Sequence, residues 1–272
     1  MISIPLEDNF TDIVGKAQRG LKLETADLAD KAGISVEAIE AVKNGEPDEA
    51  VLRAIAGPLG LGADALVAVA KGAWIPAEVE VPGLAAFNTP FEDMTVNSYL
   101  AWDRESMKAV AFDTGADCSD MLEFLHAQGL KLELILLTHT HGDHIFDIDR
   151  LREKTGAPAW VGDREPLEGV QTFAPGKTFQ VGDLTISTRL TWGHSKGGIT
   201  YVIEGLGTPV AVVGDAVFAG SMGGGAISYA DALETNRKEI FTLPADAVLC
   251  PGHGPLTTVG EQLQHNPFFA KA

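Results

Sequence analysis

The sequence THTHGDH at residues 138–144 decides which fold and which chemistry we expect of this chain. It directly follows the apolar run Leu134–Leu137, which has the length and composition of a buried β-strand. A strand that ends in a loop holds the loop's side chains in place, and binding groups are often built there. Imidazole and carboxylate groups together form a ligand set for zinc, iron or manganese. The segment therefore predicts a metal site at the end of a strand.

The spacing within this segment predicts two groups of ligands. His139 and His141 alternate along the chain, so both imidazoles can face one point. Gly142 is expected to let the backbone turn sharply, so that Asp143 and His144 face a second point. With 7 histidines in 272 residues, the pattern would arise by chance with a probability of about three in ten thousand. A metal site is therefore favoured over a solvated polar loop.

Three further candidate ligands lie where other predicted strands stop. Asp215 follows the apolar run Val210–Val213 through a single glycine. His253 lies just past the run Ala247–Cys250, and His194 lies in a glycine-flanked turn between two apolar runs. Because the ends of neighbouring strands can meet at one rim of a sheet, we expect these side chains to converge with the first motif.

The pattern of apolar residues along the chain changes between about residues 72 and 86. Before this point apolar residues recur at helical spacing and glycines interrupt them, whereas after it short apolar runs alternate with helical stretches. The second pattern is typical of a layered α/β domain. The predicted division is a helical domain at residues 1–72, a linker at 73–86 and an α/β domain at 87–272. The predicted strands are Val96–Trp102, Ala109–Phe112, Leu134–Leu137, Leu184–Leu190, Thr200–Ile203, Val210–Val213 and Ala247–Cys250, and the predicted helices of the second domain are Met121–Ala127, Ile145–Lys154 and Asp231–Phe241.

The composition restricts the class of protein. A hydrophobic content of 45% with 21% charged residues is that of a globular chain rather than a disordered one. The net charge of −18 argues against nucleic acid as the main partner, because lysine and arginine supply most of that affinity. The N-terminus lacks the pattern of a secretory signal, and no apolar run reaches the roughly 20 residues that cross a bilayer. We therefore expect a cytoplasmic protein without a membrane partner.

The motifs together resemble the metallo-β-lactamase superfamily, and within it the short bacterial glyoxalase II-like hydrolases. The resemblance covers about residues 87–268 and is carried by THTHGDH, by GHSKGG at 193–198, by the strand end at 213–215 and by PGHGP at 251–255. It implies an αββα sandwich with the site at one edge, in agreement with the α/β pattern.

The resemblance also implies the roles of individual residues. One metal would be held by three histidines, the other by an aspartate and two histidines, and a further aspartate would bridge the two metals. Asp113 would support the site from behind, and Asp143 would also act in catalysis by orienting the nucleophile. The implied cofactors are two divalent metal ions, with zinc expected and iron or manganese as alternatives. The implied ligands are His139, His141 and His194 for the first metal, Asp143, His144 and His253 for the second, and Asp215 as the bridge.

The reaction implied by such a site is hydrolysis of a small-molecule thioester. Two cations lower the pKa of a bridging water, so that hydroxide is available near neutral pH to attack the carbonyl. An arginine that short homologues often carry is replaced here by Gly224, and Lys196 is a candidate substitute. Trp192 and Phe218 lie near proposed ligands in the sequence and are candidate substrate contacts. The alternative enzyme is a persulfide dioxygenase with a single iron.

The N-terminal domain carries a second resemblance. Residues 24–46 resemble the helix-turn-helix of Xre/Cro-type repressors, which raises the alternative of a DNA-binding regulator with a metal-binding sensor domain. Residues 1–72 hold 12 acidic and 7 basic side chains, and the expected recognition helix presents Glu37 and Glu40 beside Lys43. Carboxylates there face phosphates unfavourably. We therefore expect this scaffold to serve packing, homodimer formation or covering of the active site.

Overall fold

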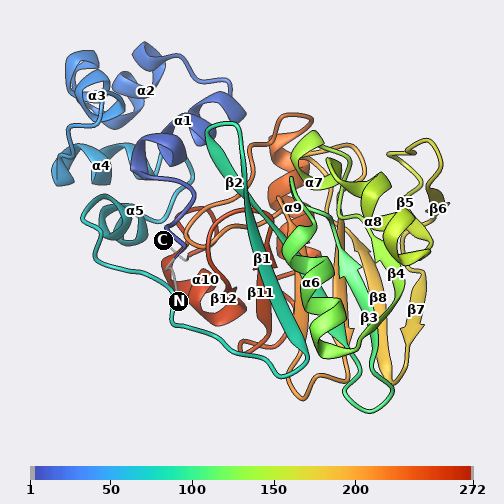
Figure 1. The fold of residues 1–272 in the computed structure, drawn as a ribbon. Helices are drawn as coiled ribbons and strands as arrows, with labels where there is room; N and C mark the ends of the chain where they lie inside the picture. Colours follow the sequence, from blue (N-terminus) through green and yellow to red (C-terminus); the bar gives the residue numbers. More distant parts are fainter. Residues whose placement is uncertain (1–3, 271–272) are drawn as a thin grey trace.

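A computed structural model of the protein describes residues 4–270. Within this range two six-stranded mixed sheets lie face to face, in the strand orders β1-β2-β3-β4-β5-β6 and β12-β11-β10-β9-β8-β7 (Figure 1). The first sheet consists of β1 (Leu84–Phe91), β2 (Met94–Trp102), β3 (Lys108–Phe112), β4 (Lys131–Leu136), β5 (Ala159–Gly162) and β6 (Gln171–Phe173). The second consists of β7 (Thr178–Val181), β8 (Leu184–Leu190), β9 (Ile199–Glu204), β10 (Val210–Gly214), β11 (Val248–Pro251) and β12 (Thr257–Thr258).

The apolar faces of the two sheets form the central core. Tyr99 and Phe112 of the first sheet pack in one cluster with Tyr201, Val212 and Cys250 of the second. A separate cluster joins the outer face of the first sheet to α6 (Ser119–Gln128) and α8 (Ile148–Thr155), and α9 (Tyr229–Glu239) and α10 (Val259–His265) cover the outer face of the second. The layers therefore run helix, sheet, sheet, helix, and the predicted α/β class is confirmed.

One predicted helix is broken in the structure. The sequence predicted a continuous helix over Ile145–Lys154, but a short α7 (Gly142–Ile145) and α8 are separate elements. The break lies at Asp147, whose carboxylate accepts a hydrogen bond of 2.9 Å from the backbone N–H of Cys118. The Asp147 N–H donates to the Thr114 hydroxyl at 3.3 Å. These contacts hold Asp147 outside either helix, so the predicted helix is present as α8 but begins at Ile148 rather than at Ile145.

The helices before the sandwich share a core with it. Apolar residues of these helices, such as Ile13 and Leu66, belong to one cluster with Val213 of β10 and Phe268 near the C-terminus. Figure 1 shows these helices, in blue, at the side of the sandwich near α10. The helix-turn-helix resemblance remains a prediction. The bounds of these helices are α1 (Phe10–Gly20), α2 (Thr25–Ala32), α3 (Val36–Lys43), α4 (Glu49–Ala56) and α5 (Ala63–Ala70).

The segment between α5 and the first sheet is not helical, and β1 begins at Leu84, within the predicted linker. Among residues 4–270, no helix is long and apolar enough to span a bilayer.

Candidate metal centre

The candidate ligands from the sequence meet at one edge of the sandwich. They lie in the loops that follow β4, β10 and β11 and in the turn between β8 and β9. Each loop begins at a buried strand, so the two sheets fix the positions of the side chains. The residues fall into two adjacent groups of potential metal-binding atoms, and within each group those atoms lie within 4.8 Å of one another. The groups are His139, His141, His194 and Asp215, and Asp143, His144 and His253.

In the first group the nitrogen atoms converge on His141. Its Nδ1 lies 3.0 Å from His139 Nε2 and 3.0 Å from His194 Nε2. Asp215 Oδ2 lies 3.3 Å from His194 Nε2 and 3.9 Å from His139 Nε2. His139 and Asp215 are buried, whereas His141 is exposed. The group is therefore open to solvent on the His141 side.

In the second group Asp143 lies between two imidazoles. Its Oδ2 is 3.3 Å from His253 Nε2 and 3.6 Å from His144 Nε2. Asp215 reaches this group as well, with Oδ1 3.2 Å from His144 Nε2 and Oδ2 3.5 Å from His253 Nε2. Asp215 is thus the one carboxylate of the seven residues that faces both groups.

In three of the candidate ligand histidines the second ring nitrogen donates to an acceptor oxygen. His144 Nδ1 donates to Asp113 Oδ2 at 2.8 Å, and His253 Nδ1 donates to the Thr95 carbonyl at 2.7 Å. His194 Nδ1 donates to the Gly224 carbonyl at 3.0 Å. Such contacts fix the tautomer and leave Nε2 free toward the centre.

Asp113 links two parts of the centre through its carboxylate. It accepts hydrogen bonds of 2.7 Å from both the backbone N–H and the hydroxyl of Thr138, in addition to the bond from His144. Its backbone is in the left-handed region with φ of 57°, which is uncommon for a residue other than glycine. The side chain is therefore held in place by three donors at the end of β3.

The residues present fit divalent cations on three observations. His144 Nε2 and Asp215 Oδ1 are buried and have no hydrogen-bond partner within residues 4–270, a costly arrangement that a cation would relieve. Tetrahedral ligands about 2.1 Å from a zinc ion stand about 3.4 Å apart, and the spacings in both groups bracket this value. A side chain at Gly252 would bring a Cβ to 2.1 Å from Asp215 Oδ1. The glycine therefore keeps the space between ligands open.

The protonation of the centre is strongly perturbed. Burial lowers the pKa of His139 well below its usual range and also lowers that of His194, while nearby imidazoles add to the effect. Burial also disfavours the charged form of His144, but the carboxylates of Asp215 and Asp113 raise its pKa to about 10. Despite its burial, Asp215 has a pKa well below the usual range because His144 and His253 face it. Such opposed shifts in one cluster are typical of functional sites.

Two features of the loops differ from what the sequence led us to expect. Gly142 begins α7 and has no left-handed backbone conformation, and an added Cβ would meet only Phe91 at 3.9 Å. The chain turns at Gly142 and Asp143 and His144 face the second group as expected, but the turn is the start of a helix and needs no glycine-specific conformation. Asn97 was expected to satisfy the backbone of a nearby turn, but its side-chain amide donates to the carbonyls of Pro251 and Gly254, more than 150 residues away, at 3.0 and 2.8 Å. Asn97 thus clamps the loop that carries His253.

The candidate substrate contacts lie in different surroundings. Phe218 is buried, with its ring centre 5.5 Å from that of His253, so it forms part of the wall next to the second group. Trp192 is half-buried and lies under the guanidinium of Arg164, 5.8 Å from the ring centre. Lys196 is exposed.

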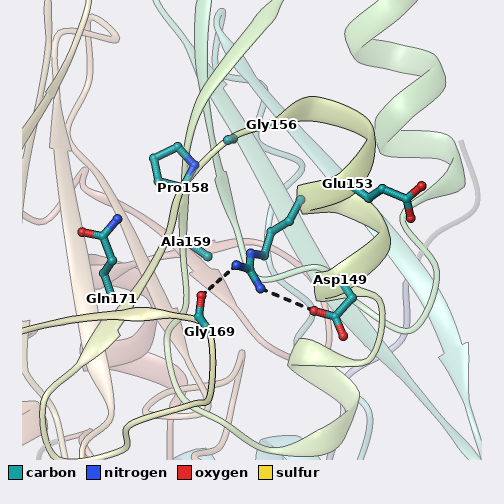
Figure 2. Close-up of a pocket in the computed structure, with 9 residues that line it drawn as sticks. Asp149, Glu153, Gly156, Pro158, Ala159, Gly169 and Gln171 are labelled. Atoms are coloured by element: carbon teal, nitrogen blue, oxygen red, sulfur yellow. Dashed lines mark hydrogen bonds and ion pairs between the residues drawn. The ribbon is translucent and has the colours of Figure 1, made fainter.

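A separate surface cavity lies away from these ligands (Figure 2). It has a volume of about 480 Å³ and is lined by residues of α8, of β5 and the loop before it, and of the start of β6 with the segment that precedes it. The Arg152 guanidinium beside it bonds to Asp149 and to the Gly169 carbonyl. Because none of the candidate ligands lines this cavity, it is not the candidate site.

An αββα sandwich with clustered His and Asp side chains at its edge defines the class of metal-dependent hydrolases. The family model of the metallo-beta-lactamase superfamily matches residues 92–253. Since this is more than half of the chain, the protein belongs to the metallo-beta-lactamase superfamily.

Known proteins support the same assignment. A probable metallo-hydrolase of Streptococcus pyogenes is 29% identical over 59% of this chain and 80% of its own length. The hydroxyacylglutathione hydrolase GloC of Haemophilus influenzae is 25% identical over 63% of this chain and 92% of its own length. Among solved structures, the B3 metallo-beta-lactamase BLEG-1 has a TM-score of 0.59 at 27% identity, covering 69% of this chain and all of its own. ETHE1 from Myxococcus xanthus has a TM-score of 0.59 at 26% identity, covering 67% of this chain and 83% of its own.

Proposed function

We propose that this metallo-hydrolase cleaves a thioester with two divalent metal ions. The observation that carries the proposal is the pair of adjacent ligand groups that share Asp215. His139, His141 and His194 would hold one cation, and Asp143, His144 and His253 the other. When bound, such cations supply an activated water at neutral pH and polarise the substrate carbonyl. We expect zinc, although the ligand types also suit iron and manganese.

The side chains of the protein contribute position and charge. Asp143 Oδ2 lies between two imidazoles at the edge of the second group. A carboxylate in this position can accept a hydrogen bond from the attacking water and orient it toward the substrate. Phe218, packed against His253, would limit water access on that side. A thiolate leaves without a strong general acid, which suits a centre whose carboxylates are ionised.

The name of one relative supports the choice of substrate class. GloC is called a hydroxyacylglutathione hydrolase, and its similarity extends over 92% of its length. At 25% identity this relationship favours thioester chemistry without fixing the acyl group.

Metal loading tests this proposal directly. Metal-free protein should bind two equivalents of added zinc. A free zinc concentration of about 100 times Kd should raise the free energy of unfolding by about 2.7 kcal/mol per site. We expect an increase in melting temperature of about 5 °C or more, reversed by a chelator. The loaded protein should hydrolyse a thioester faster than the oxygen ester with the same acyl group. Fully loaded protein that is inert toward every thioester, but active on a lactone or a phosphodiester, would refute the substrate class.

The alternative, a persulfide dioxygenase, needs a single iron held by His139, His194 and Asp215. The ETHE1 structure is comparably similar in fold. Against this alternative, Asp143, His144 and His253 form a second group directly beside the first. One equivalent of iron, with oxygen uptake on a glutathione persulfide and no thioesterase activity, would favour it over the hydrolase.

We also propose that the N-terminal helices serve the hydrolase rather than bind DNA. On α3 the expected DNA-facing side chains include the exposed Glu37. The ammonium of Lys43 lies 3.0 Å from Glu40 and so is already in an ion pair. Such a surface would be repelled by phosphates. Nanomolar binding of any duplex in a low-salt gel shift would overturn this proposal.

A further inference from the structure

A cavity of about 680 Å³ lies between helix α1 and the loop that leads into α9. One wall is formed by the C-terminal half of α1 and by Lys22 just beyond its end, and the opposite wall by residues 224–230. The cavity therefore lies at the junction of the N-terminal helices and the sandwich. Gly224, Gly225, Ser228 and Tyr229 are among the residues of the loop wall.

The cavity is adjacent to the candidate metal centre. Gly224, which lines it, is the residue whose carbonyl accepts the hydrogen bond from His194. The preceding Gly223 donates its N–H to the Asp215 carbonyl at 3.1 Å. The same segment of the loop thus contacts the first ligand group and lines the cavity.

The α1 wall carries positive charge in a protein with a net charge of −18. Lys16, Arg19 and Lys22 all line the cavity. Arg19 and Lys22 are exposed, and neither forms an ion pair with any residue in the range 4–270. Two unpaired cations beside a cavity favour an anionic ligand.

Helix α1 is firmly attached to the loop that it faces. Lys16 Nζ donates to the Met222 carbonyl at 2.9 Å and forms an ion pair with Asp8, which also accepts from the Ser221 hydroxyl. Gly20 packs directly on Tyr229, since a Cβ there would lie 2.2 Å from the ring. The two free cations are therefore held at a fixed place relative to the centre.

We propose that this cavity binds the carboxylate-bearing thiol portion of the substrate thioester, with Arg19 and Lys22 as the anion-recognising residues. The inference rests on the proposed function for the identity of the reacting bond. It gives the N-terminal helices a role in specificity, and it places substrate recognition on α1 rather than on Lys196. Lys16 is a positioning residue, because its ammonium is occupied by Asp8 and Met222.

The test compares two thioesters with the same lactoyl group in zinc-loaded protein. S-lactoylglutathione carries carboxylates on its thiol portion, whereas S-lactoyl-N-acetylcysteamine is neutral. For the double variant Arg19→Glu/Lys22→Glu we expect KM for the anionic thioester to rise at least about fivefold, with kcat unchanged. KM for the neutral thioester should change less than about twofold. High salt should diminish the difference between wild type and variant.

A matched control separates local from overall charge. The variant Lys31→Glu/Lys154→Glu makes the same change in net charge at exposed lysines of α2 and α8 that do not line the cavity. An equal rise in KM in the control, or no rise in the cavity variant, would refute the subsite. Titration of wild type and both variants with reduced glutathione reports on the cavity without turnover. Weaker binding only in the cavity variant would support the subsite even if wild type hydrolyses neither thioester, in which case the proposed function alone fails.

Discussion

Asp215→Asn should reduce kcat/KM by at least about 10³-fold, on the order of 4 kcal/mol of transition-state stabilisation. The carboxylate of Asp215 faces both ligand groups, with oxygen atoms 3.2 to 3.9 Å from four imidazole nitrogens. An amide keeps the shape but loses the negative charge that would hold two cations close together. We therefore expect metal content to fall below two equivalents, with the remaining metal held more weakly.

Elemental analysis and steady-state kinetics on the same preparation test this expectation. Asp163→Asn is a suitable control, since that aspartate is exposed and lies outside both groups. The control should retain full metal content and activity. Two tightly bound equivalents in Asp215→Asn, with activity near that of wild type, would show that Asp215 does not bridge the metals.

Asp113→Asn should lower the free energy of unfolding of the metal-free protein by about 3 kcal/mol. The buried carboxylate accepts from the Thr138 backbone, the Thr138 hydroxyl and His144 Nδ1. An amide can accept from the backbone through its oxygen, but its NH₂ group then faces the other donors. The ring of His144 would lose its orientation, and metal affinity should fall about 10- to 100-fold.

Denaturant unfolding and zinc titration measure the two effects separately. Asp117→Asn provides the comparison, because the side chain of Asp117 is exposed and bonds to Ser119 and Arg150 at the surface. The Asp117→Asn variant should lower the free energy of unfolding by about 1 kcal/mol or less and leave zinc affinity unchanged. If both variants lose the same small amount of stability, Asp113 does not organise the centre.

The sequence by itself determined the fold class and the chemical types of the candidate ligands. Runs such as Leu184–Leu190 and Val210–Val213 are found as strands close to their predicted bounds. Apolar periodicity is a local property of the sequence, so it predicts strands and helices without information about the rest of the chain. The candidate histidines and aspartates were identified from the motif at residues 138–144 and from further motifs, such as PGHGP at 251–255, that resemble those of the superfamily. Short edge strands such as β6 and β12 were missed because their pairing partners, rather than their own composition, define them.

Only the tertiary structure decided which of those side chains meet and what holds them. Asp113 and Thr138 are 25 residues apart, and Asn97 reaches the loop of His253 across more than 150 residues. The cavity beside α1 likewise depends on the docking of the N-terminal helices on α9. Contacts between distant segments follow from how the sheets and helices pack, which leaves no periodic signal in the sequence. Sequence therefore supplied the donor atoms, and packing supplied their mutual distances and the charges around them.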